Sequence, residues 1–249
     1  MAHAEAFRIL RSNLDVALAE LSHPTILVTS ASPGEGKTAT AVNLTRALTL
    51  AGRRTVLVDF DLRHPDTHNH LGADNLVGVS DVLNGDRSLS ECLQFIKVDT
   101  ERQGSDGTKG FYFLPTGPSV SNPTELLDGR RTSVLLAALA EQADLVLVDT
   151  PPLLPVADTL VIGRRVSGAI LVVETRRTPI AAIQHAKNAL LQNQTRLVGI
   201  VVNKLQPRDG RSEDGYGYGY GYGYGYGPLE TEVPSSNRAA PGHRSLPNT

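Results

Sequence analysis

The residues with the clearest chemical potential lie in one short loop between an apolar run and a helical pattern. Residues 26–30, with the sequence Ile-Leu-Val-Thr-Ser, are a short and mostly apolar run. Residues 31–38, with the sequence Ala-Ser-Pro-Gly-Glu-Gly-Lys-Thr, follow them directly. Small residues let backbone N–H groups converge on an anion, while Lys37 can reach the β and γ phosphates and the Thr38 hydroxyl can ligate Mg²⁺. The order of strand, loop and helix predicts a nucleotide site. Its first position is Ala31, where this pattern usually has glycine, and a turn that merely joins strand to helix is the alternative.

Carboxylates follow two further apolar runs. Residues 54–63 read as a buried strand that ends in Asp59, Asp61 and Arg63. Residues 143–152 contain a Val/Leu run that ends in Asp149 and is followed by Thr-Pro-Pro. A run of this form is typical of a Walker B strand, in which the carboxylate holds a Mg²⁺-bound water. Because α/β sheets bind ligands at the carboxyl ends of parallel strands, these side chains are candidates for the same site. A strand followed by an ordinary polar loop is the alternative for Asp59 and Asp61.

The last apolar run ends in an amide. Asn203 and Lys204 follow residues 197–202, so Asn203 is placed to hydrogen-bond an adenine edge, or to be a loop asparagine whose bonds are satisfied within the protein. The predicted nucleotide contacts are therefore Ser32, Pro33, Gly34, Glu35, Gly36, Lys37, Thr38, Ala39, Arg63 and Asn203.

Composition narrows the classes of protein that this chain can be. With 249 residues and 40% hydrophobic content, it can form one sizeable domain with appendages. The net charge of −2 gives no reason to expect electrostatic binding to nucleic acid or anionic lipid. A single cysteine, Cys92, forms no internal disulfide and fits a reducing cytoplasm. The sequence has no apolar run of the roughly 18 to 20 residues that span a bilayer, so we expect membrane association only through a partner or a segment beyond this chain.

Alternation of strands and helices predicts the architecture. Helical patterns at residues 122–140, 156–165 and 179–192 separate strand patterns at 111–114, 143–149, 169–173 and 197–202. Short helical turns are expected over residues 78–95, with Asn84-Gly85 as a breaker, and a mobile surface loop over residues 97–110. This order predicts an α/β fold, a mostly parallel sheet flanked by helices on both faces, as in P-loop NTPases.

The chain divides into three parts. Residues 1–22 form an amphipathic helix with a stripe of Phe7, Leu10, Leu14, Leu18 and Leu21, and on another flank carry the charged ladder Glu5, Arg8 and Arg11. Residues 23–205 form the nucleotide-binding domain. Residues 206–249 lack periodicity and are expected to be disordered.

Tyrosine alternates strictly with glycine in this tail. The cluster in residues 216–226 comprises Tyr216, Tyr218, Tyr220, Tyr222, Tyr224 and Tyr226. A low-complexity spacer is one interpretation; beside an ATP site, the repeat also reads as a set of accessible phosphoacceptors.

Taken together, the phosphate loop, Asp59-x-Asp61-x-Arg63, Asp149-Thr-Pro-Pro and the terminal tyrosines resemble the bacterial tyrosine kinases of capsular and exopolysaccharide synthesis, within the MinD/ParA-like P-loop ATPases. The resemblance covers residues 5 to about 205 and the tail. It implies ATP and Mg²⁺ as cofactors, autophosphorylation of the tail in trans, and catalytic roles for Lys37, Asp59 and Asp61. The metal ligands that it implies are Thr38, Asp59, Asp61 and Asp149.

The resemblance also implies partners. Glu5, Arg8 and Arg11 match the Glu-x-x-Arg-x-x-Arg of the family, which supports ring-like homo-oligomers. A transmembrane activator of the polysaccharide co-polymerase type, separate or fused upstream, is implied, as is a cognate tyrosine phosphatase. This places the chain in the cytoplasm at the inner face of the plasma membrane.

Two other classes remain as alternatives. The first is the MinD/ParA-like ATPases, which act as nucleotide-switched dimers without phosphorylating protein. These usually have Lys-Gly-Gly early in the loop, where this chain has Ser32-Pro33-Gly34, so the lysine is absent here. A scaffold with a degenerate ATP site is disfavoured because Thr38, Asp59, Asp61 and Asp149 are all present.

Overall fold

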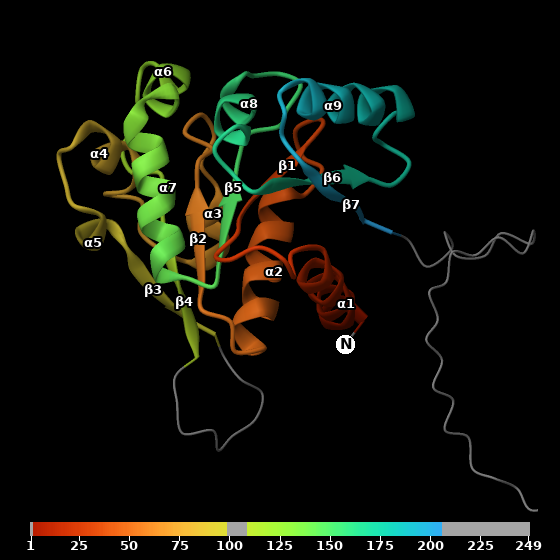
Figure 1. Ribbon diagram of the computed structural model, residues 1–249, viewed down its shortest axis with the longest axis horizontal. Helices are drawn as coiled ribbons and strands as arrows, with labels where there is room; N and C mark the ends of the chain where they lie inside the picture. Colours follow the sequence, from red (N-terminus) through yellow and green to blue (C-terminus); the bar gives the residue numbers. More distant parts are fainter. Residues whose placement is uncertain (1, 99–108, 206–249) are drawn as a thin grey trace, which may run out of the picture. The chain divides into compact units, whose positions relative to one another are not determined.

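The computed structural model describes residues 2–98 and 109–205 (Figure 1). The elements in chain order are α1 (Ala2–Ala17), β1 (Thr25–Ser30), α2 (Lys37–Leu50), β2 (Thr55–Asp59), α3 (Thr67–Leu71), α4 (Val79–Asn84), α5 (Leu89–Cys92), β3 (Gln94–Lys97), β4 (Gly110–Leu114), α6 (Pro123–Asp128), α7 (Arg130–Gln142), β5 (Leu145–Asp149), α8 (Asp158–Gly163), β6 (Gly168–Glu174), α9 (Ile180–Gln192) and β7 (Leu197–Asn203). Most of the expected 97–110 loop and the whole tyrosine tail lie outside the described residues.

Within the described residues, seven strands form one sheet in the order β3-β4-β2-β5-β1-β6-β7. All neighbouring strands are parallel except β3, which runs antiparallel to β4. The central strand β1 lies between β5 and β6, and β2 is the next strand beyond β5. The carboxyl ends of β1, β2 and β5 therefore share one edge of the sheet, and the phosphate loop leaves β1 at this edge. The predicted α/β architecture is confirmed.

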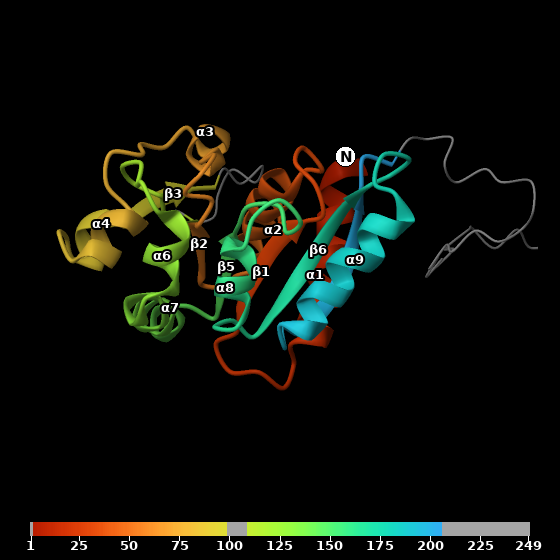
Figure 2. The same ribbon diagram turned by 90° about the horizontal axis from the view of Figure 1, so that it is seen from above.

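Alternation along the strands divides the core into two layers. In β1, Leu27 points into one layer while Ile26 and Val28 point into the other, because successive side chains of a strand face opposite sides. Helices α4, α6, α7, α8 and α9 contribute to the first layer, and α1 and α2 to the second (Figure 2). Since both faces are covered, the inner strands read as continuous apolar runs in the sequence.

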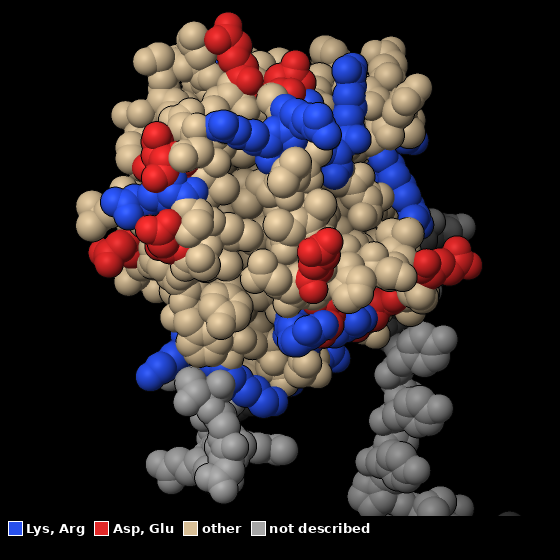
Figure 3. Space-filling view, turned by 60° about the vertical axis from the view of Figure 1, so that its left-hand side comes forward, with Lys and Arg blue, Asp and Glu red and all other residues tan. Residues whose placement is uncertain are grey.

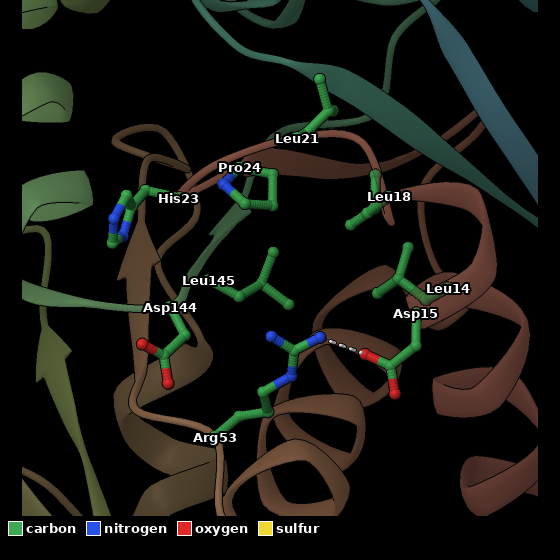
Figure 4. A pocket seen from close by; sticks show the side chains of 9 residues that line it. All are labelled: Leu14, Asp15, Leu18, Leu21, His23, Pro24, Arg53, Asp144 and Leu145. Atoms are coloured by element: carbon green, nitrogen blue, oxygen red, sulfur yellow. Dashed lines mark hydrogen bonds and ion pairs between the residues drawn. The ribbon is translucent and has the colours of Figure 1, made fainter.

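Helix α1 is anchored to the body by apolar and ionic contacts. Leu14 and Leu18 are buried in the same layer as α2. Beside them, at the amino ends of β1 and β5, lies a cavity of about 170 Å³ (Figure 4). At this cavity Arg53 Nη2 bonds Asp15 Oδ1 at 2.7 Å, which links α1 to the turn before β2. The predicted amphipathic helix thus exists, but it ends at Ala17, four residues before Leu21.

The prediction of helical turns through residue 95 is wrong at its end. Helix α5 ends at Cys92, and β3 begins at Gln94 as an edge strand. Partly buried and exposed residues alternate along β3, and the ring of Phe95 packs edge-on against Tyr112 of β4 at a centroid distance of 5.4 Å. Cross-strand pairing therefore decides the conformation of a segment whose local sequence does not. The predicted breaker is confirmed, because Gly85 adopts a left-handed conformation (φ 88°) after α4.

The prediction of one continuous helix over residues 122–140 is also wrong. Gly129 has extended backbone angles (φ −63°, ψ 155°) and separates α6 from α7. Glycine weakens a helix because it gains conformational entropy when the helix unfolds. The break lets α6 pack against α8, while α7 packs against β5. Similarly, β2 ends at Asp59, so Asp61 and Arg63 lie in the loop beyond the strand.

The surface carries mixed charge. On the face drawn in Figure 3, basic and acidic side chains are interspersed, with basic side chains gathered near the top of the view. Among the helices of the described ranges, none is both long enough and apolar enough to cross a bilayer. Opposite charges on this face offset one another at a distance.

The anchoring of α1 can be tested by shortening Leu14, whose side chain is 3% exposed. We expect Leu14→Ala to lower the free energy of unfolding by about 2 to 5 kcal/mol, because it deletes buried methyl groups beside an existing cavity. Urea denaturation measures the change. The matched control is Val16→Ala on the same helix, whose side chain is 78% exposed and whose truncation should cost about 0.5 kcal/mol or less. Equal effects of the two substitutions would contradict the packing of α1.

Candidate functional site

The phosphate loop has the geometry that anion binding requires. Gly34 (φ 81°) and Gly36 (φ 94°) both adopt left-handed conformations, which glycine allows without steric cost. Lys37 is the first residue of α2, and no side chain of the described residues caps that helix. The backbone N–H groups at its start are thus open to a ligand at the positive end of the helix dipole. Ala31 is fully buried and has no positive φ, which explains why alanine is tolerated where the pattern usually has glycine.

The lysine of the loop lies among three carboxylates. Lys37 Nζ donates to Asp61 Oδ2 at 2.9 Å and lies 3.8 Å from Asp149 Oδ1. It also lies 3.2 Å from the Thr38 hydroxyl. All three carboxylates are buried, with Asp59 and Asp149 fully so. The structure therefore brings together the candidate residues of three segments that are far apart in the sequence.

Backbone groups hold the carboxylates in place. Asp59 and Asp149 end neighbouring strands and are paired in register. Asp59 accepts hydrogen bonds from the backbone N–H of Asp61 at 3.0 Å and of Thr67 at 3.3 Å. Asp61 in turn accepts the N–H of His64 at 3.0 Å. Backbone N–H groups of the loop after β2 thus donate to the carboxylates of Asp59 and Asp61, and these hydrogen bonds fix the direction of both carboxylates.

Thr67 is a site residue that the sequence analysis missed. Its hydroxyl donates to Asp149 Oδ2 at 3.0 Å, while its backbone N–H contacts Asp59. It is fully buried at the start of α3 and bridges the two carboxylates. No sequence signal distinguished it, because a threonine after Pro-Asp is an ordinary start of a helix.

Burial and mutual repulsion shift the titration of these groups. Burial raises the pKa of Asp59 to about 8, and the nearby charge of Asp149 adds to this effect, while hydrogen bonding to the Asp61 backbone opposes it. Burial also raises the pKa of Asp149, with Lys37 opposing. For Lys37, burial lowers the pKa, but Asp149 and Asp61 outweigh it and the net pKa is raised. Raised pKa values mean that Asp59 and Asp149 hold protons more readily than exposed carboxyls, and a bound cation would favour their ionised forms.

This donor set fits a magnesium nucleotide. Asp149 Oδ1 is buried and has no hydrogen-bond partner among the described residues, so an acceptor is left for a ligand. Within residues 2–98 and 109–205, no group of three or more acidic, His or Cys side chains forms a ready cage for a metal ion. Mg²⁺ does not need one, because it retains waters and takes ligands from one or two carboxylates and from phosphates. Thr38, Asp59, Asp61 and Asp149 are the residues that would hold it.

Two predicted nucleotide contacts have other partners. Arg63 makes a bidentate ion pair with the buried Asp158, at 2.6 and 3.0 Å, and also donates to the Thr124 hydroxyl at 2.9 Å. It therefore ties the loop after β2 to α6 and α8. Asn203 Nδ2 donates to the backbone carbonyl of Glu35 at 3.0 Å, so it contacts the phosphate loop itself.

The predicted oligomerisation residues lie on α1. Arg8 pairs with Glu5 on the same helix at 3.0 Å, with both side chains more than half exposed. The Nε atom of Arg11 is buried and has no hydrogen-bond partner within the described residues. The ladder thus pairs locally in part and retains one unsatisfied donor. The six predicted phosphoacceptor tyrosines lie outside the described residues.

Comparison with protein families matches residues 26–216 to the CobQ/CobB/MinD/ParA nucleotide-binding domain. The tyrosine-protein kinase YwqD of Bacillus subtilis (strain 168) is 32% identical over 214 residues, covering 86% of this chain and 86% of the relative. The tyrosine-protein kinase wzc of Salmonella typhimurium is 31% identical over 213 residues, which is 85% of this chain but 28% of that protein. The chain therefore spans nearly all of one relative and about a quarter of the other.

A solved structure of a tyrosine kinase domain is also similar to this chain. The kinase domain of the Escherichia coli tyrosine kinase ETK superposes with a TM-score of 0.76 and is 30% identical, covering 87% of this chain and 80% of that one.

The shifted carboxyl of Asp59 predicts a pH dependence of stability. A carboxyl whose folded pKa is raised stabilises the folded state below its unfolded pKa, and this contribution is lost as pH rises through the folded value of about 8. We therefore expect the free energy of unfolding of the metal-free, nucleotide-free protein to fall between pH 5 and 8 more steeply than in Asp59→Asn. The difference in slope is at most one proton, about 1.4 kcal/mol per pH unit.

Urea denaturation at several pH values, in a chelating buffer, makes this measurement. The matched control is Asp74→Asn, which neutralises an exposed carboxyl away from the site. Parallel pH profiles for wild type and Asp59→Asn would show that Asp59 is ionised throughout this range.

Proposed function

This chain belongs to the family of CobQ/CobB/MinD/ParA nucleotide-binding domains and, within it, to the bacterial tyrosine-protein kinases, and from that membership we propose that it transfers the γ-phosphate of ATP to tyrosines of its own C-terminal tail. The observation that carries the proposal is the contact of Lys37 with the buried carboxylates Asp61 and Asp149 at the phosphate loop. The acceptors are the tyrosines of residues 216–226.

The chemistry follows from the charges of the site. The tyrosine oxygen attacks the γ-phosphorus, the bond from that phosphorus to the β,γ-bridging oxygen breaks, and ADP leaves with the bond's electron pair. Lys37 offsets the negative charge that develops on the phosphates. Asp61, beside Lys37, accepts the proton of the tyrosine hydroxyl directly or through one water. When bound, Mg²⁺ supplies charge neutralisation at the phosphate oxygens.

The contact between Lys37 and Asp61 couples the proposed binding of nucleotide to that of the metal ion. Lys37 Nζ donates to Asp61 at 2.9 Å, so phosphates must compete with this carboxylate for the ammonium group. A cation bound by the carboxylates would release the lysine to the phosphates. We therefore expect nucleotide and Mg²⁺ to bind with positive coupling.

We also propose a cellular setting. The wzc relative is more than three times as long as its match to this chain, which supports a kinase that works with a larger membrane-associated part, fused or separate. The proposed setting is the inner face of the plasma membrane, where a transmembrane activator would recruit the kinase and phosphorylation would regulate capsular or exopolysaccharide polymerisation and export. A tyrosine phosphatase would return the tail to its starting state.

The second candidate function is a nucleotide switch without phosphotransfer to protein. It is favoured by the family description, which includes MinD and ParA. Against it stands Ser32, at the position where those ATPases usually carry a lysine. The two functions differ in one product: a switch hydrolyses ATP and leaves the mass of the tail unchanged.

The kinase proposal is tested by Lys37→Met. We expect loss of phosphotransfer by several orders of magnitude, because methionine fills similar space but cannot offset phosphate charge. Purified protein is incubated with Mg²⁺ and ATP, and the mass of the tail is then determined. The matched control, Lys187→Met, removes an exposed lysine of α9 and should keep the wild-type rate. Tail labelling by Lys37→Met at the wild-type rate would refute the assignment of the phosphate loop.

Transfer between subunits is tested by mixing two proteins. The acceptor is full-length Lys37→Met, which bears the tyrosines, and the donor is an active enzyme truncated after Pro207. We expect phosphate on the acceptor's tail, because subunit contact raises the local concentration of tails at neighbouring sites.

The control for subunit contact introduces Arg8→Ala and Arg11→Ala into both partners. If α1 mediates assembly, these variants should reduce transfer at low concentration and lower the mass measured by light scattering. An unlabelled acceptor, with wild type labelling itself at a rate independent of concentration, would mean that each chain phosphorylates its own tail.

A further inference from the structure

Four residues outside the predicted metal site hydrogen-bond the phosphate loop or support the residues that do. They come from the end of β6, the turn before α9, and the end of β7 with the residue that follows it. We call them the loop clasp: Glu174, Thr178, Asn203 and Lys204. Sequence analysis singled out Asn203 and offered an adenine contact for it, whereas the other three carried no expectation.

Two members of the clasp bind carbonyl oxygens of the phosphate loop. Lys204 Nζ donates to the Gly34 carbonyl at 2.8 Å, and Asn203 Nδ2 donates to the Glu35 carbonyl at 3.0 Å. In a planar trans peptide the C=O and the following N–H point in opposite directions. Holding the carbonyls of Gly34 and Glu35 therefore aims the N–H groups of Glu35 and Gly36 away from the clasp. Convergent N–H groups are the feature by which such a loop binds phosphate.

The carboxylate of Glu35 completes the attachment. It is 1% exposed, accepts the backbone N–H of Ser32 at 2.9 Å, and accepts the Thr178 hydroxyl. The Thr178 hydroxyl in turn accepts the backbone N–H of Glu174 at 2.8 Å. One buried acid of the loop is thus satisfied partly within the loop and partly by the clasp, so the loop cannot shift without breaking these bonds.

Charge and backbone conformation both favour this arrangement. Glu174 Oε2 accepts Lys204 Nζ at 2.9 Å, and this hydrogen bond lowers the pKa of Glu174. Lys204 has a left-handed backbone (φ 58°), which is uncommon for a residue other than glycine. Such a conformation persists where surrounding contacts fix it, as the bonds to Gly34 and Glu174 do here.

Gly36 shows how closely Asn203 lies against the loop. A Cβ atom on Gly36 would come within 2.1 Å of Asn203 Nδ2, and the glycine has a positive φ. The side chain of Asn203 therefore fills the space that a larger residue of the loop would need. Its amide nitrogen already donates to the loop, which favours a positioning role over recognition of the base.

We propose that Asn203 and Lys204, supported by Glu174 and Thr178, are positioning residues that orient the backbone N–H groups of the phosphate loop for nucleotide binding. The two residues lie at the end of the described part of the chain, shortly before residue 206, where the tail begins. This inference rests on the proposed nucleotide site, but it does not require that the bound nucleotide phosphorylate protein.

The test compares the full-length variants Asn203→Ala and Lys204→Ala with wild type, and Lys187→Ala serves as the matched lysine control. Affinities for fluorescent ADP and GDP derivatives are measured in Mg²⁺. We expect each clasp variant to lower the affinities for ADP and GDP by the same factor, about fivefold to tenfold. The reason is that the lost hydrogen bonds act on the phosphate loop and not on the base. Lys204→Arg, which retains the positive charge, should recover part of the affinity.

A second measurement needs no nucleotide. Hydrogen exchange of a peptide covering residues 31–38 should be faster in the clasp variants than in wild type or Lys187→Ala, while exchange in β1 stays unchanged. Unchanged β1 exchange also shows that the variant is folded. Glu174→Gln removes the negative charge that pairs with Lys204 but leaves the lysine itself in place. We expect it to speed exchange of residues 31–38 by a smaller factor.

Two results would overturn the proposal. A loss of ADP affinity in Asn203→Ala with GDP affinity retained would assign Asn203 to the adenine ring. Wild-type affinity and wild-type exchange in Lys204→Ala would mean that the lysine does not position the loop. If Lys37→Met also bound nucleotide like wild type, the nucleotide site itself would fail; if Lys37→Met lost affinity and the clasp variants did not, the clasp would fail by itself.

Discussion

Three buried carboxylates share one lysine at the edge of the sheet where β1, β2 and β5 end, and this imbalance of charge governs the site. Removing Asp59 and Asp149 from water is costly, and the two groups also repel each other. The fold compensates with Lys37, with backbone N–H groups after β2, and with the Thr67 hydroxyl. The raised pKa values of Asp59 and Asp149 show that this compensation is incomplete, and a bound cation would complete it.

The rest of the fold can be understood as what holds this edge together. Parallel strands buried on both faces place the ends of β1, β2 and β5 side by side, and the two core layers keep them there. Around the edge, Arg63 links the loop after β2 to α6 and α8 through Asp158. On the other side, Asn203 and Lys204 link the phosphate loop to β7. Both links use charged or amide side chains whose contacts are fixed by hydrogen bonds as well as by charge.

The position of α1 bears on the proposed assembly of subunits. Its apolar stripe packs against α2, while Glu5 and Arg8 remain exposed on another flank. A helix anchored in this way can present its charged flank to a second copy without loosening the sheet. The Nε atom of Arg11, buried and unpaired within the described residues, is the group on that flank with most to gain from a partner.

The sequence by itself determined the sheet and most of the site. Strong β-branched runs, a glycine-rich loop and carboxylates at the ends of apolar runs are local patterns, and each predicts its element because the physics that produces it is local. Lys37, Thr38, Asp59, Asp61 and Asp149 were all predicted from such patterns, and the structure brings them together. The break at Gly129 and the strand β3 were missed, because helix packing and cross-strand pairing outweigh weak local preference there.

Only the tertiary structure decided which polar side chains support the site. Arg63 was predicted to bind nucleotide, but it pairs with Asp158, 95 residues away in the sequence. Thr67 and Lys204 carried no signal, since one threonine in a helix start and one lysine after a strand look like many others. Their partners come from distant segments: Lys204 reaches the Gly34 carbonyl across 170 residues. Sequence periodicity reports which face of an element is buried, whereas the partner of a single polar group is fixed only when the sheet has brought the two segments together.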